Sequence, residues 1–185
     1  VNKMSDAKKI MDTIKEKEIQ FVDLRFTDPR GKMQHLSQHV STIDEKSLAE
    51  GFMFDGSSIA GWKSIEASDM KLMIDTDSAY VDPFYAEKTL CVHCSVVEPD
   101  TGEAYERDPR GTAEKAEAYL KSSGVGDVAY MGPEAEFFLF DNVKFSNEMN
   151  KVSFEVDALD AAWNTDTDYE MGNTCLLYTS DAADD

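Results

Sequence analysis

The sequence contains no apolar run that approaches the roughly 20 residues needed for a membrane-spanning helix. Its first residues, Val1-Asn2-Lys3-Met4-Ser5, lack the apolar core of a signal peptide. Both absences argue against insertion into a membrane or transport across one. We therefore expect a protein of the cytoplasm.

Basic residues are also scarce. Lys and Arg number 18 against 37 Asp and Glu, which gives a formal net charge of −19 at pH 7. Nucleic acids and anionic membranes attract basic surfaces, so we expect no nonspecific binding to either. The 42% of hydrophobic and 10% of aromatic residues are nevertheless enough for a packed core. A chain of 185 residues has room for one ordinary domain or two small ones.

Cysteines are too few for a disulfide scaffold: the chain has Cys91, Cys94 and Cys175. The segment Cys91-Val92-His93-Cys94 has the spacing of a zinc-binding pair. A structural zinc site needs four ligands, however, and the sequence has no second pair. The flanking Thr, Leu, Ser and Val residues favour a strand in which both cysteines act as small apolar side chains.

The first hundred or so residues have the pattern of a small α+β module. Ile10, Met11 and Ile14 recur at helical spacing and predict a first helix. Thr42 and Glu45 have the spacing of a capping box, which predicts a short helix that ends near Gly51. Strands are expected at 20–26, 33–40, 70–75 and 89–97.

A second unit begins near Tyr105. Asp108-Pro109 places an N-cap residue before a first-turn proline and predicts a helix that ends at Gly124. Strands are expected at 131–140 and 151–158. Residues 175–185 resemble the translation of a sequencing-library adaptor and are set aside. We therefore predict one domain at 1–104, the start of a second at 105–174 and a non-native tail at 175–185.

Two glutamates lie within the apolar stretch 131–140. Because side chains alternate along a strand, Glu134 and Glu136 are expected on one face, with Cα atoms roughly 6.5–7 Å apart. Carboxylates beside apolar residues are costly to bury unless cations neutralise them. Two divalent ions about 3.5–4 Å apart would suit this face. The alternative is a half-exposed strand with two solvated acids, which the spacing alone favours slightly.

A loop at 54–62 combines small, turn-forming residues with flanking aromatic residues. A rigid scaffold can present a few polar groups from such a loop. The alternative, which composition alone favours, is a tight Asp55-Gly56 turn with Trp62 in the core.

Five stretches, taken in order, resemble bacterial-type (class I) glutamine synthetase. The resemblance covers nearly all of residues 5–174, and the occurrence of all five motifs in the family's order makes it specific. The stretches are Phe21-Val22-Asp23-Leu24-Arg25-Phe26; Phe54-Asp55-Gly56-Ser57-Ser58 with Trp62 and Ser68-Asp69-Met70; Arg107-Asp108-Pro109-Arg110; Gly132-Pro133-Glu134-Ala135-Glu136-Phe137-Phe138-Leu139-Phe140-Asp141; and Ala162-Trp163-Asn164 with Gly172-Asn173.

The resemblance implies an α+β fold, with a β-grasp-like N-terminal domain followed by the truncated start of an antiparallel-sheet catalytic domain. It also implies ATP-dependent ligation of ammonia to glutamate through γ-glutamyl phosphate. In the family, the two glutamates of the Pro-Glu-x-Glu strand bind metals, one beside the ATP phosphates and one near the glutamate substrate. By motif these are Glu134 and Glu136, and Mg²⁺ or Mn²⁺ suits their oxygen ligands.

By the same resemblance, Asp55 matches an aspartate that holds ammonium and accepts its proton, reaching in from the neighbouring subunit. Ser58 matches a nearby hydroxyl that orients the ammonium or the aspartate, while Trp62 and Asp69 match residues with a supporting role. Because the active site forms between subunits, the implied partners are glutamate, ammonium, ATP and further copies of the chain. The family forms a dodecamer of two stacked hexamers.

The chain ends before the family's remaining metal ligands and its ATP pocket, so we expect this polypeptide alone to be inactive. Two alternatives remain open. One is a relative that ligates glutamate to an amine larger than ammonia, and the other is a non-catalytic structural or regulatory family member. The Asp55 loop favours ammonia, and the presence of both Glu134 and Glu136 disfavours the non-catalytic alternative.

Overall fold

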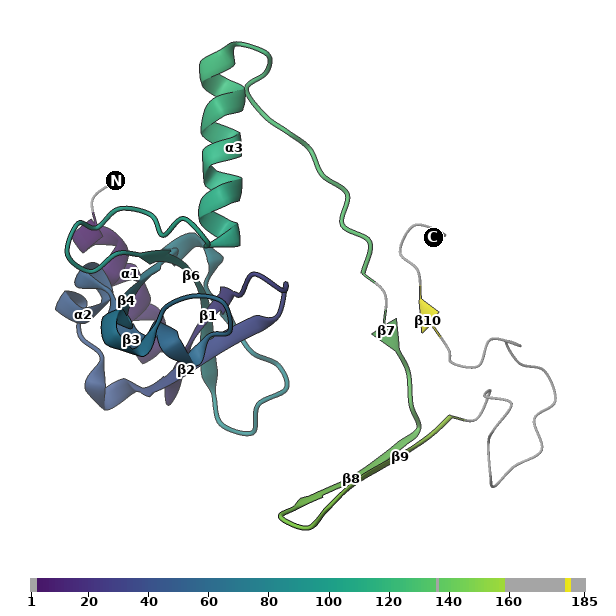
Figure 1. The fold of residues 1–185 in the computed structure, drawn as a ribbon. Helices are drawn as coiled ribbons and strands as arrows, with labels where there is room; N and C mark the ends of the chain where they lie inside the picture. The colour runs from purple at the N-terminus through teal and green to yellow at the C-terminus, as the bar shows by residue number, and fades with distance from the viewer. Residues whose placement is uncertain (1–2, 136, 159–178, 181–185) are drawn as a thin grey trace. The chain divides into compact units, whose positions relative to one another are not determined.

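The computed structural model describes residues 3–135, 137–158 and 179–180. Contacts divide the chain into two compact units, Val1–Ala129 and Tyr130–Asp185. The first unit contains helices α1 (Lys3–Glu16), α2 (Glu45–Glu50) and α3 (Pro109–Ser123) and strands β1 (Phe21–Thr27), β2 (Met33–His39), β3 (Phe52–Asp55), β4 (Asp69–Ile74), β5 (Tyr80–Val81) and β6 (Thr89–Val97) (Figure 1). The second unit contains β7 (Phe137–Phe138), β8 (Asn142–Glu148), β9 (Lys151–Asp157) and β10 (Thr179–Ser180).

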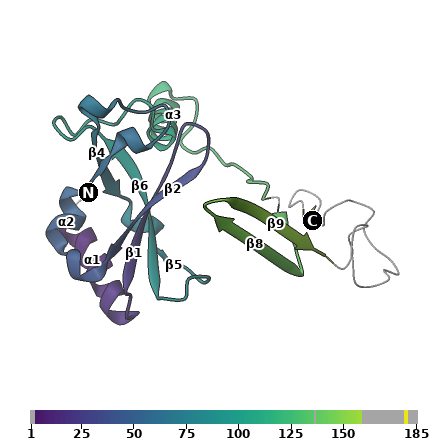
Figure 2. The same cartoon turned by 60° about the horizontal axis from the view of Figure 1, so that its bottom comes forward.

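One mixed sheet organises the first unit. Its strand order is β2-β1-β6-β4-β3, and β5 also pairs with β6. Strands β1 and β6 run parallel, whereas the other neighbours are antiparallel. Helices α1 and α2 lie on the same side of this sheet (Figure 2). The predicted strands at 20–26, 33–40, 70–75 and 89–97 are confirmed to within about a residue at each end.

The apolar core lies between this sheet and the two helices. Side chains alternate along each strand, so every second residue faces the helices. Val22, Leu24 and Leu72 on the strands are fully buried, and Ile10 of α1 and Leu48 of α2 pack in the same cluster. Burial of each such side chain contributes about 1.5–3 kcal/mol to folding.

A buried carboxylate lies on β1 among these apolar residues. Asp23 Oδ2 accepts a hydrogen bond from Arg25 Nε at 2.9 Å, and Oδ1 accepts one from the Ser37 hydroxyl at 2.7 Å. His35 Nδ1 lies 2.7 Å from Oδ1. Burial raises the pKa of Asp23, but the hydrogen bonds from Arg25, His35 and Ser37 outweigh that effect and leave the pKa below its ordinary value. Arg25 also pairs with Asp82, so the carboxylate belongs to a satisfied polar network.

Both cysteines of the Cys91–Cys94 pair lie on β6, as the sequence predicts. Three residues apart on a strand, their side chains point to opposite faces and do not approach one ion together. Cys94 belongs to the apolar core, whereas Cys91 Sγ lies 3.6 Å from Asp82 Oδ2. Burial raises the pKa of the Cys91 thiol to about 11 and that of Cys94 to about 12.

The N-cap of helix α2 lies two residues after its predicted position. The expected capping box pairs Thr42 with Glu45, but the N-cap residue is Asp44, which exchanges hydrogen bonds with Ser47. Thr42 instead ends a short 3₁₀ turn and donates its hydroxyl to the carbonyl of His39. The aspartate competes successfully because a carboxylate caps the helical N–H groups at least as well as a threonine hydroxyl does.

Helix α3 begins and ends where the sequence predicts. The side chain of Asp108 caps it by accepting a hydrogen bond from the N–H of Arg110 at 3.0 Å. The same buried carboxylate accepts the N–H of Val96 at 2.8 Å, which fastens the start of α3 to β6. Gly124 ends the helix in the left-handed conformation, with φ of 71°. No helix in the described part of the chain is both long and apolar enough to cross a membrane.

The second unit contains a hairpin with one apolar and one polar face. Its register pairs Phe145 with Phe154 and Val143 with Val156. The alternation predicted at 151–158, with Phe154 and Val156 on one face, is therefore confirmed. Phe145 and Phe154 are 81% and 80% exposed, so no other described residue covers the apolar face. Strand β8 was not predicted, because its sequence of Asn, Lys, Ser and Glu between apolar residues resembles an ordinary loop.

The glutamate stretch at 131–140 does not form the predicted buried strand. Among the residues of this stretch that the structure describes, only Phe137–Phe138 forms a strand, and it pairs with β10. Met131 is 86% exposed, and Phe138 and Leu139 are about half exposed. A short apolar segment becomes a buried strand only where neighbouring strands and a covering layer pack against it. The described residues of this unit supply one two-residue partner strand, β10, and no covering layer.

Candidate functional site

The predicted ammonium-binding loop begins at the end of β3. Asp55 is the last residue of the strand and caps a single 3₁₀ turn, Gly56–Ser58. Its side chain is exposed, and Oδ1 accepts two hydrogen bonds from Ser57, one from the backbone N–H at 2.8 Å and one from the hydroxyl at 2.6 Å. These two bonds, together with a further one from the Ser68 side chain, hold the pKa of Asp55 below its ordinary value. The carboxylate is therefore ionised at neutral pH.

Ser58 lies in the same turn, with its side chain exposed. Among the described residues its hydroxyl has no hydrogen-bond partner, so it is available to a ligand. Sequence reasoning named Ser58 and missed Ser57 and Ser68. The Asp-x-Ser spacing of a capped turn was a signal for Ser57. Ser68 belongs to the Ser68-Asp69-Met70 stretch of the family resemblance, but its proximity to Asp55 depends on the pairing of β3 with β4, which the sequence does not show.

A cluster of aromatic rings anchors the loop at both ends. Phe54 precedes Asp55 and Trp62 closes the loop, and their ring centroids lie 6.1 Å apart. Phe26 contacts both rings, at 5.0 Å and 5.6 Å, and Tyr105 contacts Trp62 at 5.4 Å. Trp62 is therefore a core residue, which confirms the expectation of a tight turn with Trp62 in the core. Its burial is also what holds the exposed polar turn in place, so the two interpretations of the loop are compatible.

Gly56 allows the turn to pack closely against β4. A Cβ atom at this position would lie 2.4 Å from Met70 Sδ and 3.0 Å from the carbonyl oxygen of Ser68. Met70 is fully buried and has little room to move. The N–H of Gly56 also donates to that Ser68 carbonyl at 2.7 Å. A side chain at position 56 would thus displace the segment that carries Asp55.

A second carboxylate stands opposite Asp55. In the antiparallel pair of β3 and β4, Asp55 is the register partner of Asp69, and both side chains are exposed. Directly opposite residues on one sheet face have Cβ atoms about 4.5–5.5 Å apart, and like charges there repel each other. A cation bound between them would relieve that repulsion.

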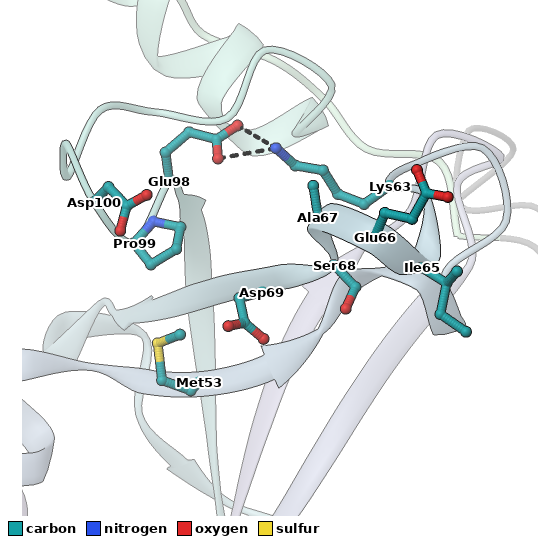
Figure 3. A pocket seen from close by; sticks show the side chains of 10 residues that line it. All are labelled: Met53, Lys63, Ile65, Glu66, Ala67, Ser68, Asp69, Glu98, Pro99 and Asp100. Carbon is teal, nitrogen blue, oxygen red and sulfur yellow. Dashed lines mark hydrogen bonds and ion pairs between the residues drawn. The ribbon is translucent and has the colours of Figure 1, made fainter.

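Asp69 also lines a pocket of about 530 Å³ on the same face of the sheet (Figure 3). Across the pocket, Lys63 Nζ forms an ion pair with Glu98 at 2.7 Å. Glu66 and Asp100 add two further carboxylates to the wall. Since acids outnumber bases among the described lining residues, this surface favours cations over anions.

The predicted metal ligands are not brought together in the described part of the chain. Glu134 lies in an exposed segment without regular secondary structure, and Glu136 lies outside the described residues. Their placement on a common face therefore stays a prediction. Within the described residues no group of three or more His, Cys, Asp or Glu side chains could hold a metal ion. The described residues therefore do not by themselves form a metal site.

Two sequence models of one family match the chain. "Glutamine synthetase, beta-Grasp domain" matches residues 18–99, and "Glutamine synthetase, catalytic domain" matches residues 106–184. The chain belongs to the glutamine synthetase family. Residues 18–99 accordingly match the β-grasp domain that the resemblance implied, and the fold class is confirmed as α+β.

Individual relatives agree with this assignment. The chain is 65% identical over 173 residues to a glutamine synthetase of Cereibacter sphaeroides, covering 94% of this chain and 36% of that protein. It is 64% identical over 170 residues to one of Rhodobacter capsulatus, covering 92% of this chain and 39% of that protein. The chain thus spans a little over a third of the length of these curated relatives.

A solved structure supports the fold independently. The cryo-EM structure of Plasmodium falciparum glutamine synthetase superposes with a TM-score of 0.62 at 23% identity, covering 84% of this chain and 30% of that chain. Glutamine synthetases as a family use ATP and divalent metals.

Proposed function

We propose that this chain is part of a glutamine synthetase that ligates ammonia to the side-chain carboxylate of glutamate with ATP. The observation that carries the proposal is the state of Asp55. Its carboxylate is exposed, held by Ser57 and kept ionised by a lowered pKa on a loop anchored by buried aromatic rings. Such a group suits the binding of a small cation, and ammonium is the cationic substrate of this family's reaction.

The proposed reaction has two chemical steps. The γ-phosphoryl group of ATP is transferred to the γ-carboxylate of glutamate, which gives γ-glutamyl phosphate and ADP. Ammonium then loses a proton to Asp55, and the resulting ammonia attacks the γ-carbonyl carbon. The new C–N bond forms as the C–O bond to phosphate breaks, and glutamine and phosphate leave. In this scheme Asp55 first attracts the cation and then accepts its proton, while Ser58 orients it.

The low pKa of Asp55 makes the first of these roles the stronger one. A carboxylate with a depressed pKa is a weak proton acceptor but a stable anion, and it therefore holds a cation well. Asp69, the register partner of Asp55, adds a second negative charge on the same face. We propose that the two acids together concentrate ammonium at this loop.

We propose that Glu134 and Glu136 are metal ligands in the whole protein, where further ligands come from parts of the enzyme absent from this chain. Oxygen ligands of this kind suit Mg²⁺ or Mn²⁺, and such an ion would neutralise phosphate charge during transfer. Mg²⁺ demands nearly complete octahedral coordination, so two glutamates are insufficient. For this reason we propose that the 185-residue chain is inactive by itself.

We further propose that residues 1–104 form the N-terminal domain and 105–174 the start of the catalytic domain, with 175–185 as a non-native tail. The tail lies outside the described residues except for 179–180. The whole enzyme is proposed to be a cytoplasmic dodecamer of two stacked hexamers, in which Asp55 of one subunit serves the active site of its neighbour.

The test uses the enzyme encoded by the uninterrupted gene. Glutamine formation is measured with glutamate, ATP and Mg²⁺ at increasing ammonium chloride, for the wild type and for Asp55→Asn. We expect ammonium-dependent synthesis in the wild type and a fall of roughly 100-fold or more in kcat/KM for ammonium in the variant. Methylammonium replaces ammonium in a parallel series. If it were the better substrate, the assignment to ammonia would be wrong.

The isolated 185-residue chain is assayed in parallel for γ-glutamyl transfer. We expect no ATP- and metal-dependent product. Product formed by the purified chain would overturn the proposal that it is inactive.

A further inference from the structure

Both hydrogen bonds that Asp55 accepts from Ser57 end on a single carboxylate oxygen. The Ser57 backbone N–H and hydroxyl donate to Oδ1 at 2.8 Å and 2.6 Å. A carboxylate has two oxygens and about four acceptor positions. Oδ1 is therefore occupied from within the loop, whereas Oδ2 receives no bond from Ser57.

Two bonds from one neighbouring residue also fix the orientation of the carboxylate. The N–H bond is the ordinary one of a capped turn, in which the capping side chain accepts from the residue two positions ahead. The hydroxyl bond is additional, and it prevents the carboxyl group from rotating freely about its terminal torsion, which is otherwise broad. An exposed aspartate with only the N–H bond would sample several orientations.

We propose that Ser57 is a positioning residue for Asp55, which turns the free carboxylate oxygen toward the ammonium in the reaction proposed above. This inference rests on the proposed function and deepens it, because it assigns a role to a residue that the family resemblance did not single out. Ser57 acts through Asp55 and need not touch the substrate. Ser58, the next residue, is the hydroxyl with no partner in the described part of the chain and is the one left to contact the ligand.

The charges that face Asp55 are few. Asp69 on β4 is its register partner, and Lys71 occupies the next position of β4 on the same sheet face, opposite Met53. The Ser68 side chain makes a smaller contribution to the lowered pKa of the carboxylate. The hydroxyl of Ser57 makes the largest contribution to the lowered pKa of Asp55, so its removal should raise that pKa toward the ordinary value for aspartate.

The kinetic test compares Ser57→Ala and Ser57→Thr in the enzyme from the uninterrupted gene. A hydrogen bond to a charged group is worth enough to change binding about tenfold, and the backbone N–H bond survives in the variant. We therefore expect Ser57→Ala to raise KM for ammonium on the order of tenfold while kcat changes less than about threefold. Ser57→Thr keeps a hydroxyl and should restore most of the affinity.

Ser64→Ala is the matched control. Ser64 lies in the same loop region and precedes the 3₁₀ turn Ile65–Ala67, but its side chain makes no capping hydrogen bond. It should leave KM for ammonium unchanged. If Ser57 served only to pack the loop, Ser57→Ala would lower kcat as well as raise KM for ammonium, and Ser57→Thr would not restore the affinity. That result would overturn the positioning role.

A second measurement does not depend on catalysis. Carboxyl ¹³C shifts of Asp55 are followed against pH by NMR in the 185-residue chain, for the wild type and both Ser57 variants. The pKa should rise in Ser57→Ala and stay low in Ser57→Thr. An unchanged pKa in Ser57→Ala overturns the proposal.

The two proposals fail in distinguishable ways. If Asp55→Asn abolishes ammonium-dependent synthesis but Ser57→Ala keeps the wild-type KM, the role of Ser57 is wrong and the proposed function survives. If Asp55→Asn retains full ammonium-dependent synthesis, the loop is not the ammonium site and both proposals are overturned.

Discussion

The two compact units contain similar apolar side chains, but only the first encloses a core. In the unit Val1–Ala129, residues such as Leu24 and Leu72 have no exposed surface. In the unit Tyr130–Asp185, Phe145 and Phe154 lie on a hairpin face with about four-fifths of their surface exposed. The alternating hydrophobic pattern is thus enough to set the register of the hairpin, but it is not enough to bury the hairpin's apolar face.

The difference has a simple physical origin. A sheet buries one face only when a second layer of structure covers it. In the first unit, α1 and α2 supply that layer, and the sheet in turn fixes the Asp55 loop through Phe54 and Trp62. The described part of the second unit has strands but no covering layer. A site residue on the first unit is therefore held in place locally, whereas Glu134 is not.

The largest expected effect is the loss of a core side chain from the first unit. Leu24→Ala removes a fully buried leucine from β1 and should lower the free energy of unfolding of that unit by about 2–5 kcal/mol. Phe154→Ala in the hairpin is the matched change in the second unit and should cost about 0.5 kcal/mol. Urea unfolding followed by hydrogen exchange of peptides from each unit measures both. Equal effects would mean that the hairpin is covered in solution.

The next effect concerns the buried network of the first unit. Asp23→Asn removes the charge that Arg25 and His35 contact and should lower the free energy of unfolding by about 2–3 kcal/mol at pH 7. Because the folded pKa of Asp23 lies below its unfolded value of about 3.9, its contribution is present above that pH and is lost as the pH falls further.

The corresponding measurement is the free energy of unfolding between pH 2 and pH 7. Asp23→Asn should flatten the acid limb, whereas Asp12→Asn, which changes an exposed acid on α1, should leave it as in the wild type. An acid limb of wild-type steepness in Asp23→Asn would show that other carboxylates govern acid unfolding.

A glycine in each unit provides a sharper comparison. Gly56→Ala places a Cβ against Met70 and Ser68 and should cost about 1–3 kcal/mol, with faster amide exchange around Asp55. Gly132→Ala meets no atom within 4 Å and should be close to neutral. Hydrogen exchange and thermal unfolding of the two variants decide the matter. A neutral Gly56→Ala would mean that the turn packs less closely than described.

The smallest effect is expected for the exposed ion pair of the hairpin. Lys144 Nζ lies 3.4 Å from Glu155 Oε1, and both side chains are largely exposed. Glu155→Gln should change stability by about 0.5 kcal/mol or less, and that change should vanish in 1 M salt. A larger, salt-resistant loss would place this pair in a drier environment than the hairpin surface.

Local chemistry allowed much of the fold to be predicted. The strand at 89–97, the cap at Asp108 and the stop at Gly124 follow from propensity and capping rules that operate within a few residues. The shift of the α2 cap from Thr42 to Asp44 shows where such rules fail. Two residues that favour the N-cap position lie close together, and the 3₁₀ turn that contains Thr42 leaves Asp44 as the cap. At the candidate site, Asp55 and Ser58 came from the family resemblance. The contacts that Ser57 and Ser68 make with Asp55 became visible only in the structure.

The sequence by itself determined the family, the α+β class, and the three helices and four of the strands of the first unit, because these depend on short-range periodicity and on motifs that occur in a fixed order. Only the tertiary structure decided which groups meet: Asp23 with His35, and Asp55 with Asp69. Such contacts join residues from different strands. Their partners are set by sheet register and packing, which depend on the whole unit rather than on the residues nearby in sequence.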